Sequence, residues 1–121
     1  MSSTTDQTEA EIYNSNLDLS TLPHFTHEEL RQYNGTTNPK IYVAIRGRVY
    51  DVSQNLNSYG PGKAYNRLAG IDGSRLLGMN KLVSDDKEDW YTEDLDDSQN
   101  AIIDKWVIFF DKRYHVIGTV G

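Results

Sequence analysis

Two short segments rich in β-branched and aromatic residues place the strongest constraint on the fold of this chain. Residues 41–45 read Ile-Tyr-Val-Ala-Ile and residues 49–52 read Val-Tyr-Asp-Val, and only Arg46-Gly47-Arg48 separates them. Strand-forming runs joined by so few residues predict an antiparallel β-hairpin with a tight turn. Because two strands alone are only marginally stable in water, other segments of the chain must cover this hairpin.

Local signals predict three short helices around the hairpin. The sequence Thr26-His27-Glu28-Glu29 is typical of a capping box, and it predicts a helix that ends near Tyr33, before Asn34-Gly35. Residues 65–70 and 74–78 are predicted to form two more short helices, on either side of a turn.

A longer helix and a last strand are predicted near the C-terminus. The helix is expected to start at Asp97 or Ser98, with that residue as its cap, and to run to about Arg113; residues 115–120 are expected to close the sheet. Its apolar face is expected to be buried against the hairpin and consists of Ile102, Ile103, Trp106, Phe110 and Tyr114. The whole pattern predicts a small α+β domain.

Composition excludes several classes of protein. The 121 residues contain no cysteine, so disulfides and thiolate metal sites are excluded. The longest apolar run is the five residues 106–110, far from the ~20 that cross a bilayer. With neither such a span nor a signal peptide in this sequence, we expect a cytoplasmic protein.

Charge is unevenly distributed along the chain, whose formal net charge is −6. Residues 1–22 are polar and acidic and are expected to be a disordered N-terminal tail, followed by one domain over 23–121. Residues 85–97 hold eight acidic residues and one lysine. This acidic run could dock on a basic partner or be an ordinary solvated loop. No dense basic stripe is present, so nucleic acid is not expected as a partner.

The sequence contains no complete motif for nucleotide binding, zinc binding or nucleophilic catalysis. Gly60-Pro61-Gly62-Lys63 suggests a phosphate loop, but Asn57 and Ala64 stand where that motif needs glycine and a hydroxyl residue. His24 and His27 lack the further ligands of a zinc site. No nucleophile elbow is present. We therefore expect a protein that is not an enzyme.

Two tyrosines flank the glycine loop, and they are the residues that remain of interest. Tyr59 precedes Gly60-Pro61-Gly62 and Tyr65 follows it. Either both rings are buried packing residues with bonded hydroxyls, or the glycines let a flat ligand approach the backbone while the phenols face it. The residues themselves leave both readings open.

Several stretches in a fixed order carry a resemblance to a known family. The stretches are Phe25-Thr26, Glu29-Leu30, Tyr33-Asn34-Gly35, residues 41–52, Tyr59-Gly60-Pro61, Tyr65, residues 69–75, Trp106, Phe110, Tyr114 and Gly118. Together they resemble the membrane-associated progesterone receptor family of cytochrome b5-like haem/steroid-binding domains. The resemblance covers roughly residues 25–120. It implies a small mixed sheet with short helices around a haem pocket and one long C-terminal helix.

The resemblance also implies a cofactor and a set of residues that hold it. The cofactor is ferric haem b, with the Tyr65 phenolate as the axial iron ligand and a supporting hydrogen bond from Tyr59. The family's pattern further assigns Gly60, Asp72, Arg113 and Tyr114 to the cofactor site, with Arg113 placed to pair with a haem propionate. A phenolate ligand is chemically reasonable, because ferric iron is a strong local charge that promotes loss of the phenol proton. Since the chain has no HPGG motif, a bis-histidine electron carrier is not expected.

For function, the resemblance implies support or regulation of haem-thiolate monooxygenases of the endoplasmic reticulum in sterol and lipid metabolism. It would place this chain in the cytoplasm or peripherally at the endoplasmic reticulum membrane. A steroid and a second copy of the chain, stacked through haem, are the other partners that it implies. The alternative is a haem-free module that binds a steroid or a protein, in which Tyr59 and Tyr65 only pack.

Overall fold

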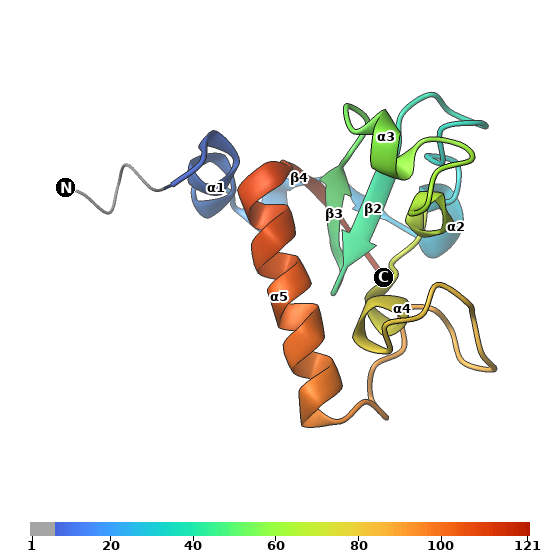
Figure 1. Ribbon diagram of the computed structural model, residues 1–121. Coiled ribbons are helices and arrows are strands. Elements are labelled where there is room, and N and C mark those ends of the chain that lie inside the picture. Colours follow the sequence, from blue (N-terminus) through green and yellow to red (C-terminus); the bar gives the residue numbers. More distant parts are fainter. Residues whose placement is uncertain (1–6) are drawn as a thin grey trace.

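A four-stranded mixed sheet with one long helix against it forms the centre of the molecule, as the computed structural model of residues 7–121 shows (Figure 1). The strand order is β1-β4-β3-β2; β1 is parallel to β4 and the other neighbours are antiparallel. The elements are α1 (Glu9–Ser15), η2 (Leu19–Thr21), β1 (His24–Phe25), α2 (His27–Leu30), β2 (Tyr42–Ile45), β3 (Arg48–Asp51), α3 (Leu56–Tyr59), η3 (Asn66–Leu68), α4 (Ser74–Gly78), α5 (Asp97–Arg113) and β4 (Val116–Val120). The predicted α+β class is confirmed.

The hairpin of β2 and β3 turns over two residues rather than three. Ile45 pairs with Arg48, so only Arg46 and Gly47 form the turn, with φ angles of 51° and 81°. Positive φ at both positions is the geometry that matches the twist of a hairpin. The turn is held from outside, because the amide of Gly47 donates to Asp72 Oδ2 (2.9 Å) and the amide of Arg46 donates to Ser74 Oγ (2.7 Å).

Alternation along the strands divides the apolar residues into two clusters. Val43 and Ile45 face a large core on one side of the sheet, while Tyr42 and Ala44 face a smaller cluster with Leu30 on the other. The period of two follows from strand geometry. The large core is closed by α4 and α5, and Figure 1 shows α5 running along the sheet on that side.

Helix α5 has a different cap and a narrower buried face than the sequence predicted. Its N-cap is Asp96, not Asp97 or Ser98, because Gln99 completes a capping box with Asp96. Ile103 and Phe110 are completely buried, whereas Trp106 only lies partly against the core. Trp106 is partly buried and packs against this core, so the expectation that it would be largely buried is confirmed only in part.

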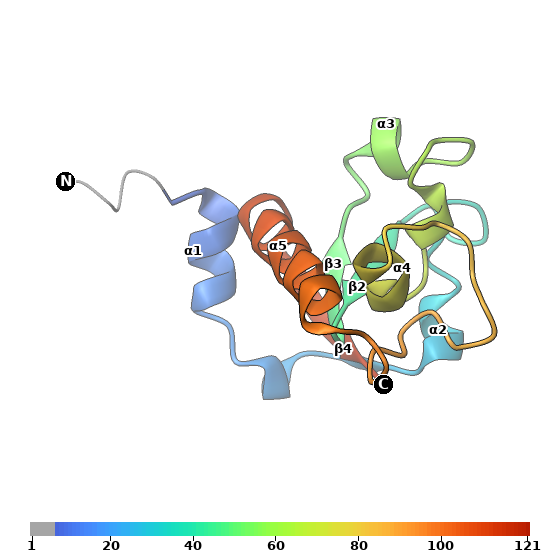
Figure 2. The same cartoon turned by 60° about the horizontal axis from the view of Figure 1, so that its bottom comes forward.

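The N-terminal segment is ordered where it is described, so the expectation of a disordered tail over 1–22 is corrected for residues 7–22. Helix α1 has its own capping box between Thr8 and Glu11, and Ala10 is buried. Figure 2 shows α1 beside α5, on the far side of α5 from α4. Residues 1–6 lie outside the described part of the chain. The boundary of the domain at residue 23 stays a prediction.

Much of the acidic run is bound within the molecule. Arg75 is only 5% exposed, and its guanidinium contacts the carboxylates of Asp85 at 2.7 Å and Asp94 at 2.5 Å. Hydrogen bonds from Arg75 lower the pKa of both carboxyls, that of Asp85 to about 2. Asp89 pairs with Arg67. The loop that carries the acidic run is therefore fixed to α4 by buried charge pairing.

The central packing residue of α5 should be Phe110. Phe110→Ala is expected to lower the free energy of unfolding by about 3–5 kcal/mol, because it leaves a cavity among buried aromatic rings. Trp106→Ala serves as the control and should cost clearly less, since Trp106 is partly exposed. Urea unfolding of both variants measures the difference. An equal loss for the two would show that the assigned faces of α5 are wrong.

Candidate functional site: an aromatic cluster at the end of the long helix

Aromatic side chains from α3, the loop after it, β3 and the C-terminal half of α5 meet around Phe110. The ring of Phe110 lies 5.1 Å from Tyr114, 5.2 Å from Tyr50 and 6.1 Å from Tyr59, measured between centroids. These distances are typical of edge-to-face aromatic pairs. Both tyrosines that the sequence singled out, together with Tyr114, thus lie in one cluster.

Tyr59 forms the buried part of the site. It is the last residue of α3 and is 3% exposed, and its ring lies 6.0 Å from Tyr65 and 6.2 Å from Tyr114. Burial raises the pKa of Tyr59, and the neighbouring phenols of Tyr114 and Tyr65 raise it further, while Arg113 lowers it. Tyr59 is therefore a neutral phenol at physiological pH.

The loop between the two tyrosines needs glycine at its first position. A Cβ on Gly60 would lie 2.6 Å from the carbonyl oxygen of Leu56, so a larger residue would displace the end of α3. Two hydrogen bonds then close the loop: the Tyr65 amide donates to the Ser58 carbonyl (3.0 Å), and Asn66 Nδ2 donates to the Tyr59 carbonyl (2.9 Å). Gly60 thus acts through the backbone, and the loop delivers Tyr65 to the surface of the cluster.

Tyr65 is half-buried and lies at the outer edge of the cluster. Its ring is 6.1 Å from Trp106, at an angle of 65°. Among the hydrogen bonds of the described residues, none joins the hydroxyls of Tyr59 and Tyr65, so the implied supporting bond between them stays a prediction.

Tyr114 is fixed at the point where α5 ends. Its amide donates to the Phe110 carbonyl (2.8 Å), and its hydroxyl accepts a hydrogen bond from Asn55 Nδ2 (2.8 Å). Asn55 was not predicted as part of the site, although its side-chain amide lies only four residues before Tyr59 in the sequence.

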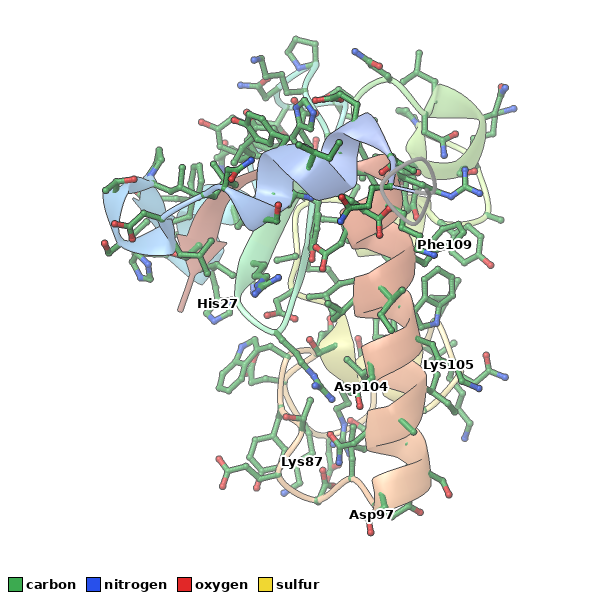
Figure 3. All side chains as sticks on the ribbon, turned by 90° about the vertical axis from the view of Figure 1, so that its left-hand side faces the viewer. His27, Lys87, Asp97, Asp104, Lys105 and Phe109 are labelled. Carbon is green, nitrogen blue, oxygen red and sulfur yellow. The ribbon has the colours of Figure 1, made fainter. Side chains whose placement is uncertain are left out.

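A shallow apolar surface adjoins Tyr65, and a polar groove lies near it. The apolar surface is a shallow hollow of about 270 Å³, lined by Ile102, Lys105, Trp106 and Phe109. Figure 3 shows Lys105 and Phe109 following one another along the side of α5.

The polar groove encloses about 650 Å³ and is lined by Asn55, Tyr114, the basic side chains Lys112 and Arg113 and the acidic side chains Glu9 and Asp51, among others. Arg113 lies at the border between the two hollows, because its guanidinium carbon sits 4.4 Å from the centre of the Phe109 ring.

Asp72 has different partners from the other implied site residues. It is 5% exposed, and its carboxylate accepts from the amide of Gly47 and from the amide and hydroxyl of Ser74. These bonds hold the hairpin turn against the start of α4. The structure thus brings Tyr59, Gly60, Tyr65, Arg113 and Tyr114 together and does not bring Asp72 to them.

The three histidines have partners of their own, although His115 follows Tyr114 and lines the same polar groove. His24 bonds to Thr119 and to the Gly121 carbonyl, His27 stacks on Trp90, and His115 bonds to Glu9. Within residues 7–121, no group of three or more His, Cys, Asp or Glu side chains is placed to hold a metal ion.

Comparison with known proteins identifies the family of this chain. The family model described as "Cytochrome b5-like Heme/Steroid binding domain" matches residues 26–95. The chain is 42% identical to an Arabidopsis thaliana protein named probable steroid-binding protein 3, over 79% of this chain and 96% of that one. The chain belongs to the cytochrome b5-like haem/steroid-binding family.

Relatives within this family include proteins of the membrane-associated progesterone receptor group. The chain is 36% identical to "Cytochrome P450 regulator dap1" of Schizosaccharomyces pombe and 38% identical to human membrane-associated progesterone receptor component 2, each over 79% of this chain. It spans 61% of the yeast relative and 44% of the human one. No helix within residues 7–121 of our chain is long and apolar enough to cross a bilayer.

A solved structure confirms the predicted cytochrome b5-like fold. An Arabidopsis thaliana protein described as having a cytochrome b5 like fold superimposes with a TM-score of 0.73 at 39% identity, over 82% of this chain and 91% of that one. The family match includes Tyr59 and Tyr65 but ends before α5. Arg113 and Tyr114 thus lie beyond the matched residues.

The residues of the site fit the haem that the family description names. A haem has a flat apolar ring and anionic propionates, and here an apolar surface at Trp106 and Phe109 adjoins basic side chains at Lys112 and Arg113. Tyr65 stands beside this surface with a hard oxygen donor. Haem bound there would supply a ferric iron, a centre that favours a phenolate ligand.

Proposed function

We propose that this chain binds ferric haem b with the phenolate of Tyr65 as axial ligand, and supports or regulates haem-thiolate monooxygenases of sterol and lipid metabolism. The main support for the proposal is the different exposure of Tyr59 and Tyr65. Tyr59 is buried and held neutral, while Tyr65 reaches the edge of an apolar surface next to Trp106. Tyr65 is thus the phenol that a flat ligand on the surface can reach.

The surrounding residues supply the remaining parts of the haem site. The ring would lie on the surface of Ile102, Trp106 and Phe109, and Arg113 and Lys112 would pair with the propionates. A hard anionic oxygen stabilises ferric over ferrous iron, so reversible electron transfer is disfavoured. This argues for a regulatory role and against an electron carrier or an enzyme.

The partner class comes from the relatives. One of them bears the name of a cytochrome P450 regulator, and others are named as steroid-binding proteins or progesterone receptor components. We propose sterol 14α-demethylase, at the endoplasmic reticulum membrane, as one such partner. A steroid is a further candidate ligand of the same apolar surface.

Removal of the Tyr65 hydroxyl should show whether this residue binds the haem iron or only packs its ring. Tyr65→Phe is expected to lower haem affinity at least tenfold, or about 1.4 kcal/mol, with little loss of folding stability. Tyr59→Phe should act in the same direction more weakly, because Tyr59 is not the ligand. Tyr33→Phe is a matched control, since Tyr33 stacks on Tyr42 in the other cluster.

Titration with hemin, followed in the visible spectrum, measures these affinities. Unchanged affinity and spectrum in Tyr65→Phe would reject Tyr65 as the ligand. Failure of the wild-type chain to bind hemin would favour the alternative of a haem-free steroid- or protein-binding module.

The open side of the haem is expected to support a dimer. Phe109 is 40% exposed and lines, with Ile102 and Trp106, a shallow apolar surface on α5. Two haem-loaded copies should therefore associate by stacking their exposed faces. Sedimentation velocity should show a dimer with hemin and a monomer without it. A monomer in both states would contradict the dimer and leave the haem site standing.

The free part of the acidic run is expected to dock on a basic monooxygenase surface. Asp94 pairs with Arg75 and Asp96 caps α5, so their removal would disturb the fold itself. Asp86 and Glu93 are exposed and make no ion pair within residues 7–121. Asp86→Asn with Glu93→Gln should slow association with sterol 14α-demethylase and flatten its salt dependence.

Asp104→Asn provides the control, because Asp104 is exposed on α5 and makes only a surface ion pair with Arg46. Association rates at two salt concentrations measure the effect. Equal rates for the double variant and the wild type at both concentrations would exclude the acidic run from the interface.

A further inference from the structure

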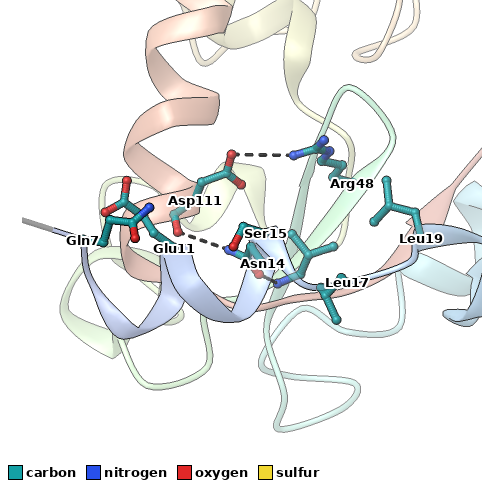
Figure 4. A pocket seen from close by; sticks show the side chains of 9 residues that line it. Gln7, Glu11, Asn14, Ser15, Leu17, Leu19, Arg48 and Asp111 are labelled. Atoms are coloured by element: carbon teal, nitrogen blue, oxygen red, sulfur yellow. Dashed lines mark hydrogen bonds and ion pairs between the residues drawn. The ribbon is translucent and has the colours of Figure 1, made fainter. Parts of the chain in front are cut away.

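One side chain of the N-terminal helix joins three backbone groups around the end of α5. Asn14 Nδ2 donates to the carbonyls of Asp111 (3.1 Å) and Tyr114 (2.9 Å), and Asn14 Oδ1 accepts from the amide of Val116 (2.9 Å). Figure 4 shows Asn14 pointing from α1 toward α5. The last carbonyls of a helix have no partner inside the helix, so Asn14 satisfies groups that otherwise need water or a cap.

Neighbours of Asn14 on α1 hold the residue that follows Tyr114. The ring of Tyr13 stacks on His115 at 4.0 Å and 24°, and Glu9 bonds to His115 Nε2 at 2.9 Å. Ala10 of the same helix is buried. Helix α1 is thus attached at residues 111–116 by side chains from two of its turns.

Hydrogen bonds hold Tyr114 at its amide, at its carbonyl and at its side-chain hydroxyl. The Tyr114 amide bonds within α5, its carbonyl bonds to Asn14, and its hydroxyl bonds to Asn55. The ring between these points lies 5.1 Å from Phe110 and 6.2 Å from Tyr59. A shift of the Tyr114 carbonyl would therefore move a phenol that packs on the buried tyrosine of the proposed site.

We infer that Asn14 is a positioning residue for haem binding: through the carbonyl of Tyr114 it sets the place of that ring, so that α1 controls haem affinity from outside the pocket. The inference rests on the proposed haem function. It does not require contact between α1 and haem. Outer-shell partners of metal ligands change affinity by about 10–100-fold, and Asn14 acts one step further out.

A double-mutant cycle tests the inference on the full chain. Asn14→Ala should lower hemin affinity by about tenfold, and Tyr114→Ala, which removes the ring, should lower it as well. The variant carrying both changes should bind no more weakly than Tyr114→Ala alone, because that variant already lacks the ring whose place Asn14 sets. Asn16→Ala is the matched control, since the Asn16 side chain bonds to the Ile12 carbonyl of its own helix. Independent, multiplying effects, or wild-type affinity in Asn14→Ala, would overturn the inference.

Two further measurements separate this inference from folding and from the haem proposal. Asn14→Asp keeps the oxygen that accepts from the Val116 amide and loses the Nδ2 group that donates to Asp111 and Tyr114. It therefore replaces Asn14→Ala in the titration if Asn14→Ala folds poorly, and the same loss of hemin affinity is expected. In the haem-free chain, the NMR signals of the Tyr114 ring should shift in Asn14→Ala and stay fixed in Asn16→Ala. Unshifted Tyr114 signals would overturn the inference even if the wild type binds hemin. A wild-type chain that binds no hemin would overturn the proposed function, whatever Asn14 does to Tyr114.

Discussion

Burial of the Phe110 ring is the interaction on which both the fold and the site depend. Phe110 is completely buried and contacts the rings of Tyr50 of β3 and Tyr59 of α3, and that of Tyr114 at the end of its own helix. The same contacts that attach α5 to the sheet therefore set the distance between α3 and the end of α5. A binding surface built beside such a packed cluster is rigid before any ligand arrives.

Buried polar contacts hold the remaining segments around this core. Asp72 fastens the hairpin turn to α4, and Arg75 fastens the acidic loop to the same helix. Each of these side chains is almost fully buried, so loss of a partner would leave an unpaired charge inside the molecule. The segments that lack apolar residues of their own are thus ordered by charge and hydrogen bonding.

Local patterns in the sequence predicted the hairpin, the capping box at Thr26 and the two tyrosines at the loop, because each depends on residues a few positions apart. The cap of α5 was placed one or two residues late, since Asp96, Asp97 and Ser98 can all accept hydrogen bonds; the Gln99 partner of Asp96 was the signal that decides. Trp106 was predicted to be largely buried because helical spacing shows which residues share the apolar face of a helix. The spacing does not show which of these residues lies at the centre of that face.

Side-chain contacts between residues far apart in the sequence were not predicted. Asn14 lies in a polar segment, and its partners are about one hundred residues away in the sequence, so nothing local marks it as ordered. Likewise, Asp72 was assigned to the cofactor by family pattern, while the structure shows its oxygens engaged by Gly47 and Ser74. The contacts of Asn14 and Asp72 are therefore seen only in the folded structure.

Resonance Raman spectroscopy of the hemin-loaded full chain tests whether a tyrosine oxygen holds the haem iron. Ligation by Tyr65 should give a five-coordinate, high-spin ferric spectrum with enhanced tyrosinate ring modes that shift when the protein is made with ring-deuterated tyrosine. A six-coordinate, low-spin spectrum typical of two histidine ligands, with no tyrosine-dependent bands, would contradict it.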